Sequence, residues 1–468
     1  MSLYKESDIQ LVKDNIAGVL EKVRAKQLEI FEPTGEEQKT VRGIIKNYII
    51  ENKKKLYGGY ALHLLITNKN PDDGLYQDTD SIDYDIYSSD PILDLTNICN
   101  LLHDKGYKNV VGREAMHKET YSIFVNYQLY CDLSYMPAKL YNKLPTIQIN
   151  NILVSDPYFI YIDYLRMMSD PLVSYLMKRT VDKSFERFYL LQKYYPLKKM
   201  ESPLKFDYAN KIQNVLQTTY NFLSKKEGVV FLGFVAYNKM MEAVDDKQIT
   251  PIPYYECILA DYQKDGLSLL NHLKTEYENI VVTEHYPFFQ YFDFHAKIFY
   301  DNKCICVIYG NNKMCVPYKI YDGIKIASFA ATLRYLLITM IKAYVDNDKS
   351  LSDQVKTVIW KIYSARQTYL KNHTIFDDSV FQDFIVDCLG ETITPDREQR
   401  LLIEYRKAKG KKYRFAYEPS TDERKTSTVN YIFANSSGNP INNPKNLKLV
   451  QGAEPEEIRD IEENENTQ

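Results

Sequence analysis

Apolar side chains recur every three or four residues at the start of the chain, and this spacing predicts two helices. The first begins at a capping box at Ser7 and runs to about Ile30. The segment 33–35 ends it, and a second helix is predicted over 36–52. These residues predict an N-terminal helical region over 1–55. One face of the first helix carries its apolar residues Ile9, Val12, Ile16, Val19, Leu20 and Val23.

The pattern changes over Leu56–Tyr87, where Gly58-Gly59 leads into an apolar helix and a short strand then carries two acids. Strand side chains alternate between faces, so Asp83 and Asp85 share one face. Aspartate is depleted in strands, and two carboxylates on one face repel each other unless a cation lies between them. The stretch therefore predicts a divalent-metal site, with room for a phosphate at the Gly-Gly step.

A hairpin is predicted after a helix over 92–105, because the β-type runs 120–125 and 127–135 meet at Asn126. Asp132 is the only acid in the second run. A lone strand aspartate is more often a turn or edge residue. Its position one hairpin after the paired acids nevertheless favours a third metal ligand.

Residues 155–196 have a helical pattern. Asp156-Pro157 predicts one helix to about Met168, and Asp170-Pro171 predicts another that contains Lys178, Arg179, Lys183 and Arg187. Lys183 and Arg187 are four positions apart and share a helix face. The pattern is typical either of a solvated face or of a clamp on a triphosphate or an RNA backbone.

The sequence pattern of residues 56–133 then recurs after Gly228. Residues 229–237 align with 56–62, residues 258–261 align with 86–90, and residues 297–308 match 122–133 without a gap. Tyr254, Glu256 and Val307 stand where the first copy has Asp83, Asp85 and Asp132. The sequence therefore predicts a second, degenerate copy of the same fold that has lost the carboxylates.

The C-terminal part is predicted to be helical over 327–345, 351–371 and 379–389 and again after Pro395. Residues 407–415 interleave basic and aromatic side chains, which suits a single-stranded nucleic-acid backbone or a solvated helix end. Roughly the last forty residues are polar and acidic, and we expect them to be largely disordered.

Composition adds few constraints. The net charge of −3 gives no global nucleic-acid signature, and the 41 tyrosines fit an AT-rich coding sequence better than a dedicated stacking surface. Seven cysteines, an odd number, are typical of a reducing compartment. Cys304, Cys306 and Cys315 form the only cysteine cluster. Cys304-Ile305-Cys306 lies in an apolar, strand-like run, so we interpret its sulfurs as core packing rather than as a zinc site. No signal peptide or membrane-length apolar run is found, so we expect a soluble intracellular protein.

Gly58-Gly59, the run Ile82–Ile86 and Asp132 together resemble the nucleotidyltransferase superfamily of the DNA-polymerase-β type. More closely, the chain resembles the poly(A) polymerase catalytic subunits of nucleocytoplasmic large DNA viruses of the mimivirus and megavirus type, with poxvirus relatives more distant. This narrower likeness rests on Tyr164–Pro171, on Lys183 and Arg187 before Lys193–Pro196, and on the degenerate second copy.

The resemblance implies an α+β fold. It contains a polymerase-β-like nucleotidyltransferase domain, made of a mixed sheet with helices, and a second, degenerate nucleotidyltransferase-like domain, with helical elements around both. The expected division is a helical region over 1–55, a catalytic domain over 56–200, an inactive domain over 201–415 and a polar tail over 416–468.

The implied activity is template-independent polyadenylation of mRNA, in which AMP passes from ATP to an RNA 3′-hydroxyl and pyrophosphate is released. Asp83 and Asp85 would bind both of two catalytic Mg²⁺ or Mn²⁺ ions, and Asp132 would bind the ion near the primer end. Gly58 and Gly59 would contact the β- and γ-phosphates. Lys183 and Arg187 match a basic helix that faces the triphosphate. Many relatives carry Ser where this chain has Gly59, so backbone N–H groups must make that contact here.

Other functions stay open on the sequence alone. One is a different template-independent nucleotidyltransferase, such as a uridylyl- or CCA-adding enzyme. Another is a non-catalytic RNA-binding processivity subunit. The expected partners are the RNA 3′ end, ATP and a second copy of the chain in a homodimer. The expected location is the host-cell cytoplasm, a viral factory or the virion.

Overall fold

The computed structural model describes residues 4–30, 34–77, 82–117, 119–176, 183–204, 206, 209–245, 250–311, 314–408, 410, 414–422, 436–443 and 446–449. The chain divides into two compact units. The first unit comprises residues 1–134, 148–154 and 414–428, and the second comprises 135–147, 155–413 and 429–468. The domain boundaries expected from the sequence stay predictions.

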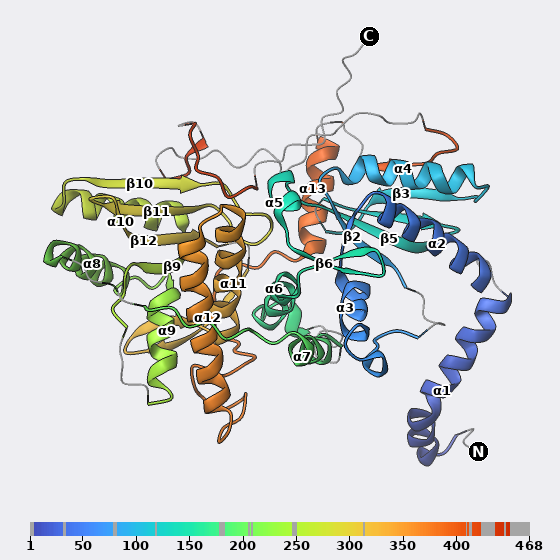
Figure 1. The fold of residues 1–468 in the computed structure, drawn as a ribbon, viewed down its shortest axis with the longest axis horizontal. Coiled ribbons are helices and arrows are strands. Elements are labelled where there is room, and N and C mark those ends of the chain that lie inside the picture. The colour runs from blue at the N-terminus through green and yellow to red at the C-terminus, as the bar shows by residue number, and fades with distance from the viewer. Residues whose placement is uncertain are drawn as a thin grey trace, which may run out of the picture. The chain divides into compact units, whose positions relative to one another are not determined.

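The first unit is built on a mixed sheet of eight strands in the order β16-β3-β4-β5-β2-β1-β7-β6 (Figure 1). Its strands are β1 (Lys55–Tyr57), β2 (Tyr84–Ser88), β3 (Val110–Glu114), β4 (Thr120–Val125), β5 (Gln128–Tyr135), β6 (Thr146–Ile149), β7 (Ile152–Ser155) and β16 (Ala416–Tyr417). Its helices are α1 (Glu6–Ile30), α2 (Gly35–Glu51), α3 (Gly58–Thr67), the 3-10 turn η1 (Pro71–Asp73) and α4 (Pro91–Asp104). Helix α4 packs on β3 and β4, and α2 packs on α4.

The second unit contains a mixed sheet in the order β10-β11-β12-β9-β8-β14-β13-β15. Its strands are β8 (Val229–Phe231), β9 (Tyr255–Leu259), β10 (Ile280–His285), β11 (His295–Tyr300), β12 (Lys303–Gly310), β13 (Val316–Tyr321), β14 (Ile324–Ala327) and β15 (Cys388–Leu389). Its helices are α5 (Ala138–Lys143), α6 (Pro157–Met168), the 3-10 turn η2 (Ser174–Leu176), α7 (Phe185–Tyr194), α8 (Asn210–Leu223), α9 (Gly233–Glu242), α10 (Tyr262–Glu276), α11 (Phe329–Val345), α12 (Lys349–Tyr369) and α13 (Pro395–Ala408). No helix in the described ranges is both long and apolar enough to cross a membrane.

The duplication predicted from the sequence is confirmed by the register of the two sheets. In the first sheet, Tyr57 lies opposite Asp85. Their counterparts in the second unit, Leu232 and Glu256, are paired in the same way, because the backbone N–H of Leu232 donates to the carbonyl of Glu256. The hairpin β4–β5 has its register shift after Ile123, and β11–β12 has it after Ile298, the aligned position.

The caps and turns repeat as well. Asp90 caps α4 and Asp261 caps α10, each by accepting a hydrogen bond from the N–H three residues later. The hairpin turns Asn126-Tyr127 and Asp301-Asn302 have positive φ at both residues. The two sheets are therefore one pattern used twice, as the aligned residues predict.

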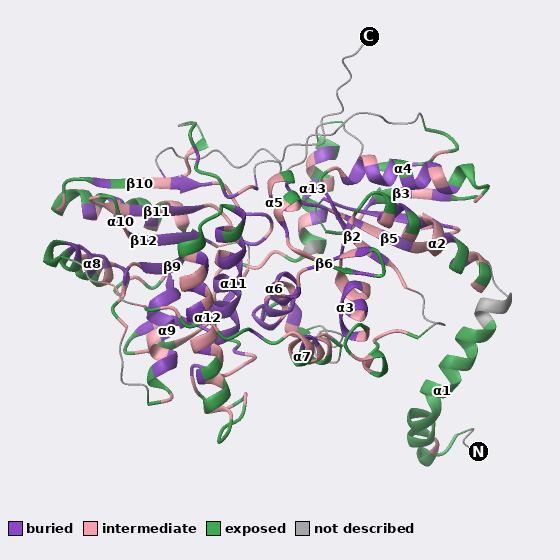
Figure 2. Cartoon of the chain, viewed as in Figure 1, coloured by how far each residue is buried: buried purple, intermediate pink, exposed green. Residues whose placement is uncertain are grey.

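Helix α1 is present as predicted, but its apolar face is exposed to solvent (Figure 2). Ile9, Val12 and Val19 are 57%, 56% and 50% exposed. Burial of such a stripe normally stabilises an amphipathic helix. The apolar stripe of α1 is therefore not buried by other described residues of the chain.

The helix predicted over 379–389 is wrong. The guanidinium of Arg366 donates to the carbonyl of Phe381 at 2.5 Å and pairs with Asp383, and Phe384 has a positive φ of 55°. Cys388 and Leu389 then pair with β13 as β15. Contacts with distant residues hold this segment in turns, and such contacts cannot be predicted from the local sequence pattern.

The helix predicted from Asp170 also differs. Asp170 is followed by a turn and the 3-10 turn η2, and α7 begins only at Phe185. The side chain of Asp170 accepts a hydrogen bond from the N–H of Val173 at 3.2 Å, which favours a tight turn. Lys178 and Arg179 lie outside the described residues.

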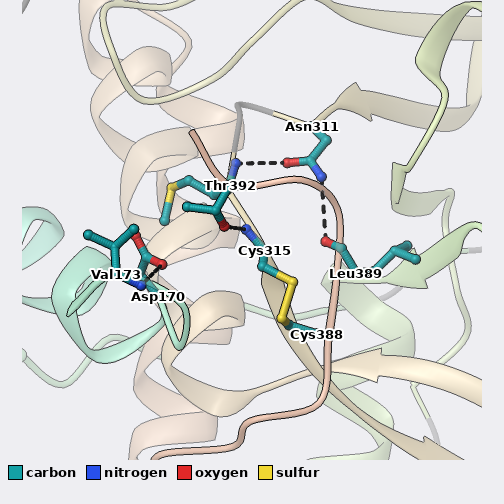
Figure 3. Close-up of a disulfide and its surroundings, with 8 residues drawn as sticks. Asp170, Val173, Asn311, Cys315, Cys388, Leu389 and Thr392 are labelled. Atoms are coloured by element: carbon teal, nitrogen blue, oxygen red, sulfur yellow. Dashed lines mark hydrogen bonds between the residues drawn. A yellow bond between two sulfur atoms is a disulfide. The ribbon is translucent and has the colours of Figure 1, made fainter. Parts of the chain in front are cut away.

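A disulfide joins Cys315 to Cys388, with the two Cα atoms 5.2 Å apart (Figure 3). The pairing of β13 with β15 brings the two cysteines together across 73 residues of sequence. The sequence analysis did not predict this bond, because it took the odd number of cysteines as a sign of a reducing compartment. Cys99, Cys131, Cys257, Cys304 and Cys306 are free thiols.

Two segments of the tail expected to be disordered hold defined positions on the second sheet. The N–H of Ile441 donates to the backbone carbonyl of Glu284 at 2.8 Å, and the N–H of Lys448 donates to the side-chain carboxylate of Glu284 at 2.8 Å. Ile441 and Leu449 are buried. These hydrogen bonds and the burial of the two apolar side chains explain why 436–443 and 446–449 hold defined positions. The rest of the last forty residues lies outside the described part of the chain.

Glu256, the second copy's counterpart of Asp85, predicts a pH-dependent stability. Burial raises the pKa of its carboxyl to about 7. The folded state therefore holds a proton that the unfolded state releases, so stability falls as pH rises from about 4.5 to 7 and stays level above that range. Glu256→Gln keeps an acceptor for the Tyr309 hydroxyl, which lies 3.2 Å away. This variant should be more stable than the wild type by on the order of 3 kcal/mol at pH 8, with no gain at pH 4.

Thermal unfolding of both proteins at the two pH values measures the effect. Glu242→Gln is the control, because Glu242 forms only an exposed ion pair with Lys239 and should change stability little at either pH. An equal stability difference for Glu256→Gln at pH 4 and pH 8 would contradict the assignment.

Candidate active site

Three carboxylates gather on the first sheet as the sequence predicts. Asp83, Asp85 and Asp132 each place an oxygen atom so that all of these atoms lie within 4.8 Å of one another. All three side chains are half-buried. Among the described residues this is the only such cluster of three or more potential metal-binding side chains.

The strand pairing brings the three acids together. Asp83 directly precedes β2 and Asp85 lies on it, while Tyr84 between them is buried on the other face. Asp132 lies on β5, the neighbour of β2 in the sheet. The alternation of strand side chains then places all three carboxylates on one face.

Gly58 makes room for this cluster. Its φ is +72°, and a Cβ atom there would lie 2.6 Å from Cγ of Asp85 and even closer to Oδ2. Any other residue would therefore displace the Asp85 carboxylate and strain the backbone. Sequence reasoning assigned the glycine to a phosphate and missed this requirement, because it depends on a residue of another strand.

Gly58 is also the first residue of α3, so the N-terminus of this helix lies beside the carboxylates. Tyr57 is its N-cap residue and makes no side-chain hydrogen bond to the first turn. The first N–H groups of a helix have no partner within the helix, and they attract anions. Gly58 and Gly59 therefore occupy a position that suits a phosphate group, next to the carboxylates.

Burial raises the pKa of the Asp132 carboxyl, and the charge of Asp83 adds to this effect. The hydroxyl of Ser122 opposes it, since its Oγ donates to Oδ1 of Asp132 at 2.5 Å. Like charges held this close are costly unless a cation neutralises them. The cluster is thus electrostatically incomplete without a positive charge.

The donor set fits a hard divalent cation such as Mg²⁺ or Mn²⁺, because it consists of carboxylate oxygens. The nearest sulfur ligand in sequence, Cys131, is fully buried. Burial raises the pKa of its thiol well above the usual range, so the thiol stays protonated. The arrangement therefore suits an oxygen-ligand site for a hard divalent cation and not a zinc–thiolate site.

A set of hydroxyl groups on the same sheet face was not singled out from the sequence. The hydroxyls of Tyr57 and Ser134 lie 2.6 Å apart, and those of Thr120 and Ser134 lie 2.9 Å apart. The ring of Tyr57 stacks on Tyr87 with the ring centroids 4.0 Å apart. The period-2 positions of Thr120 and Ser122 opposite β5 are the signal that could have identified these residues.

Lys183 is exposed and precedes α7 by two residues, and Arg187 is half-buried in the first turn of that helix. They belong to the second compact unit, whereas the three acids belong to the first. Their contact with a triphosphate stays a prediction.

Two family models match the chain. The model of the poly(A) polymerase catalytic subunit matches residues 43–174, and the model of the C-terminal part of the APMV poly(A) polymerase catalytic subunit matches residues 189–451. A poly(A) polymerase catalytic subunit of Acanthamoeba polyphaga mimivirus is 32% identical in an alignment 492 positions long, which covers 95% of this chain and 84% of the relative. The chain belongs to the poly(A) polymerase catalytic subunit family. It is therefore a polynucleotide adenylyltransferase, and its function is polyadenylation.

The fold agrees with this family. The crystal structure of the Megavirus polyadenylate synthase superposes with a TM-score of 0.88 at 33% identity, covering 96% of this chain and 94% of that one. A poly(A) polymerase catalytic subunit of African swine fever virus (isolate Pig/Kenya/KEN-50/1950) is 27% identical over 215 residues, or 44% of this chain and 42% of the relative. The α+β fold with its mixed sheets is confirmed, and the three acids of this poly(A) polymerase lie within the catalytic-subunit match.

Proposed function

We propose that Asp83, Asp85 and Asp132 bind two divalent cations, Mg²⁺ or Mn²⁺, at the catalytic centre of this poly(A) polymerase. The observation that carries this proposal is the convergence of three carboxylate oxygens within 4.8 Å. Such ions, when bound, activate a 3′-hydroxyl and neutralise the pyrophosphate leaving group. Asp83 and Asp85 are proposed to hold both ions, and Asp132 the ion nearest the RNA 3′ end.

The substrates in this proposal are ATP and an RNA 3′ end. Gly58, Gly59 and the N–H groups of the first turn of α3 bind the β- and γ-phosphates through the backbone, because Gly59 has no hydroxyl to contribute. Lys183 and Arg187 supply positive charge to the triphosphate. Transfer of AMP forms a phosphodiester bond between the RNA 3′-oxygen and the α-phosphate and breaks the bond between the α- and β-phosphates. Pyrophosphate leaves, and the hydroxyl loses its proton.

A nucleotide-selectivity assay tests this reaction. A short RNA is incubated with Mg²⁺ and each of the four nucleoside triphosphates in turn, and again after chelation with EDTA. ATP should extend the RNA, UTP and CTP should not, and EDTA should stop extension until Mg²⁺ is restored. Comparable extension with UTP or CTP would contradict adenylate selection, and extension in excess EDTA would contradict the metal assignment.

We further propose that the protein is a homodimer that acts in the host-cell cytoplasm, a viral factory or the virion. The exposed apolar face of α1 supports self-association, because Ile9, Ile16 and Val23 recur at seven-residue intervals with Val12 and Val19 between them. Such a seven-residue repeat is typical of helices that pair along an apolar seam.

Replacing both Ile16 and Val19 by Asp should convert this dimer into a monomer, because two buried charges at a helix seam would lack partners. Light scattering of the full chain measures the mass. Gln10→Asp, which adds a charge on the opposite side of α1, should leave the dimer intact. A wild-type monomer that still makes long tails would refute the dimer.

A further inference from the structure

Ser122 lies directly opposite Asp132 in the register of β4 and β5. Its Oγ donates to Oδ1 of Asp132 at 2.5 Å, and the residue is 6% exposed. This bond is short, as expected for a hydroxyl that donates to an ionised carboxylate. Ser122 is thus in contact with one of the three acids from the neighbouring strand.

A hydroxyl in this position restricts the carboxylate. The terminal torsion of an aspartate is broad, so a strand aspartate can rotate its two oxygens with little resistance. Donation to Oδ1 fixes that rotation and leaves Oδ2 with its lone pairs available for a cation. Groups that hold metal-binding side chains in this way contribute to metal affinity although they do not touch the metal.

The second copy supplies an internal comparison. The pair equivalent to Ser122 and Asp132 is Lys297 and Val307, which lie opposite each other in β11 and β12. The sheet keeps its register and its bulge with these different residues. The hydroxyl is therefore not required for the strand pairing, and it is absent where the carboxylate is absent.

Lys297 adds a second point to this comparison. Its charge lowers the pKa of the buried Glu256, which occupies the position of Asp85, although burial outweighs that effect. In the second copy a lysine thus provides a positive charge near the remaining acid. In the first copy, serine occupies that position and donates a hydrogen bond to Asp132 instead.

We propose that Ser122 is a positioning residue that orients Asp132 for divalent-metal binding. This inference rests on the proposed function, in which Asp132 binds a metal ion. It assigns to β4 a part in the site that the three acids alone do not reveal.

Titration of the full-length protein with Mn²⁺ alone, followed by electron paramagnetic resonance of the free ion, tests the role without a turnover. Ser122→Ala should weaken Mn²⁺ binding by about 10-fold, because loss of a group that hydrogen-bonds a metal ligand typically lowers metal affinity by about 10- to 100-fold. Ser122→Cys should weaken it too, because a thiol is a poor donor, whereas Ser122→Thr should restore most of the affinity. Ser134→Ala is the matched control, since it removes a hydroxyl from the same face that does not bond Asp132.

A second measurement separates positioning from general damage. In polyadenylation assays, Ser122→Ala should raise the Mg²⁺ concentration needed for half-maximal rate while the rate at saturating Mg²⁺ stays near that of the wild type. Wild-type Mn²⁺ affinity in Ser122→Ala, or an equal loss in Ser122→Thr, would overturn the inference. Asp132→Asn distinguishes the two proposals, because unchanged Mn²⁺ affinity in that variant would refute the proposed metal site itself.

Discussion

Asp83→Asn and Asp85→Asn should each lower the rate of RNA extension by on the order of 10³-fold, because loss of a metal ligand removes several kcal/mol of charge stabilisation in the transition state. Both substitutions keep the size of the side chain and remove one of three clustered negative charges. The folded state should therefore be as stable as the wild type or more so. RNA affinity should not fall, because the change removes negative charge.

Single-turnover extension of a labelled RNA, with a separate binding titration, measures the two effects. Glu256→Gln is the matched control, since Glu256 occupies the position of Asp85 in the second sheet. Its extension rate should equal that of the wild type. Extension at the wild-type rate by Asp83→Asn would contradict a catalytic role for the three acids.

Gly58→Ala should lower the extension rate by on the order of 10²-fold, because displacement of a reacting group by about 1 Å can cost that much. The added Cβ would lie 2.6 Å from Cγ of Asp85, so this carboxylate must move. The positive φ of +72° adds a cost of about 1–2 kcal/mol to the folded state. Extension kinetics and thermal unfolding of the same variant measure both effects.

Two other glycines control for this substitution. Gly233 has a φ of +54°, and a Cβ there would lie 2.8 Å from Cδ of Glu256, so Gly233→Ala should destabilise the protein without lowering the extension rate. Gly43 lies in α2 with nothing within 4 Å of its Cβ position, so Gly43→Ala should be neutral or stabilising by about 0.5–1 kcal/mol. Similar loss of activity in Gly58→Ala and Gly233→Ala would indicate general damage and contradict the local explanation.

Features recorded in short stretches of sequence were predicted well. Asp83 and Asp85 share a strand face because of the two-residue period, and Asp132 follows in a hairpin whose turn at Asn126 the sequence indicates. The second copy was found for the same reason. Its strands, caps and turns repeat residue types at matching positions, and the register of both sheets agrees with the alignment.

Features set by distant contacts were missed. The segment 379–389 has a helical pattern, but Arg366 holds it in turns from another helix. Cys315 and Cys388 meet only because two strands pair across 73 residues. The steric role of Gly58 and the hydrogen bond from Ser122 both depend on side chains of a neighbouring strand. For Arg366, for the two cysteines and for Gly58, the decisive partner lies too far along the chain for a local pattern to identify it. The register of the predicted hairpin could have identified the contact of Ser122 with Asp132.

The central claim is that Asp83, Asp85 and Asp132 form the metal centre of this poly(A) polymerase. Crystals soaked with Mn²⁺ and a non-hydrolysable ATP analogue allow the ions to be located by anomalous scattering. We expect two peaks within bonding distance of the three carboxylates, with the phosphates of the analogue at the first turn of α3. A map with no anomalous peak at these carboxylates, while the analogue is bound, would contradict the account.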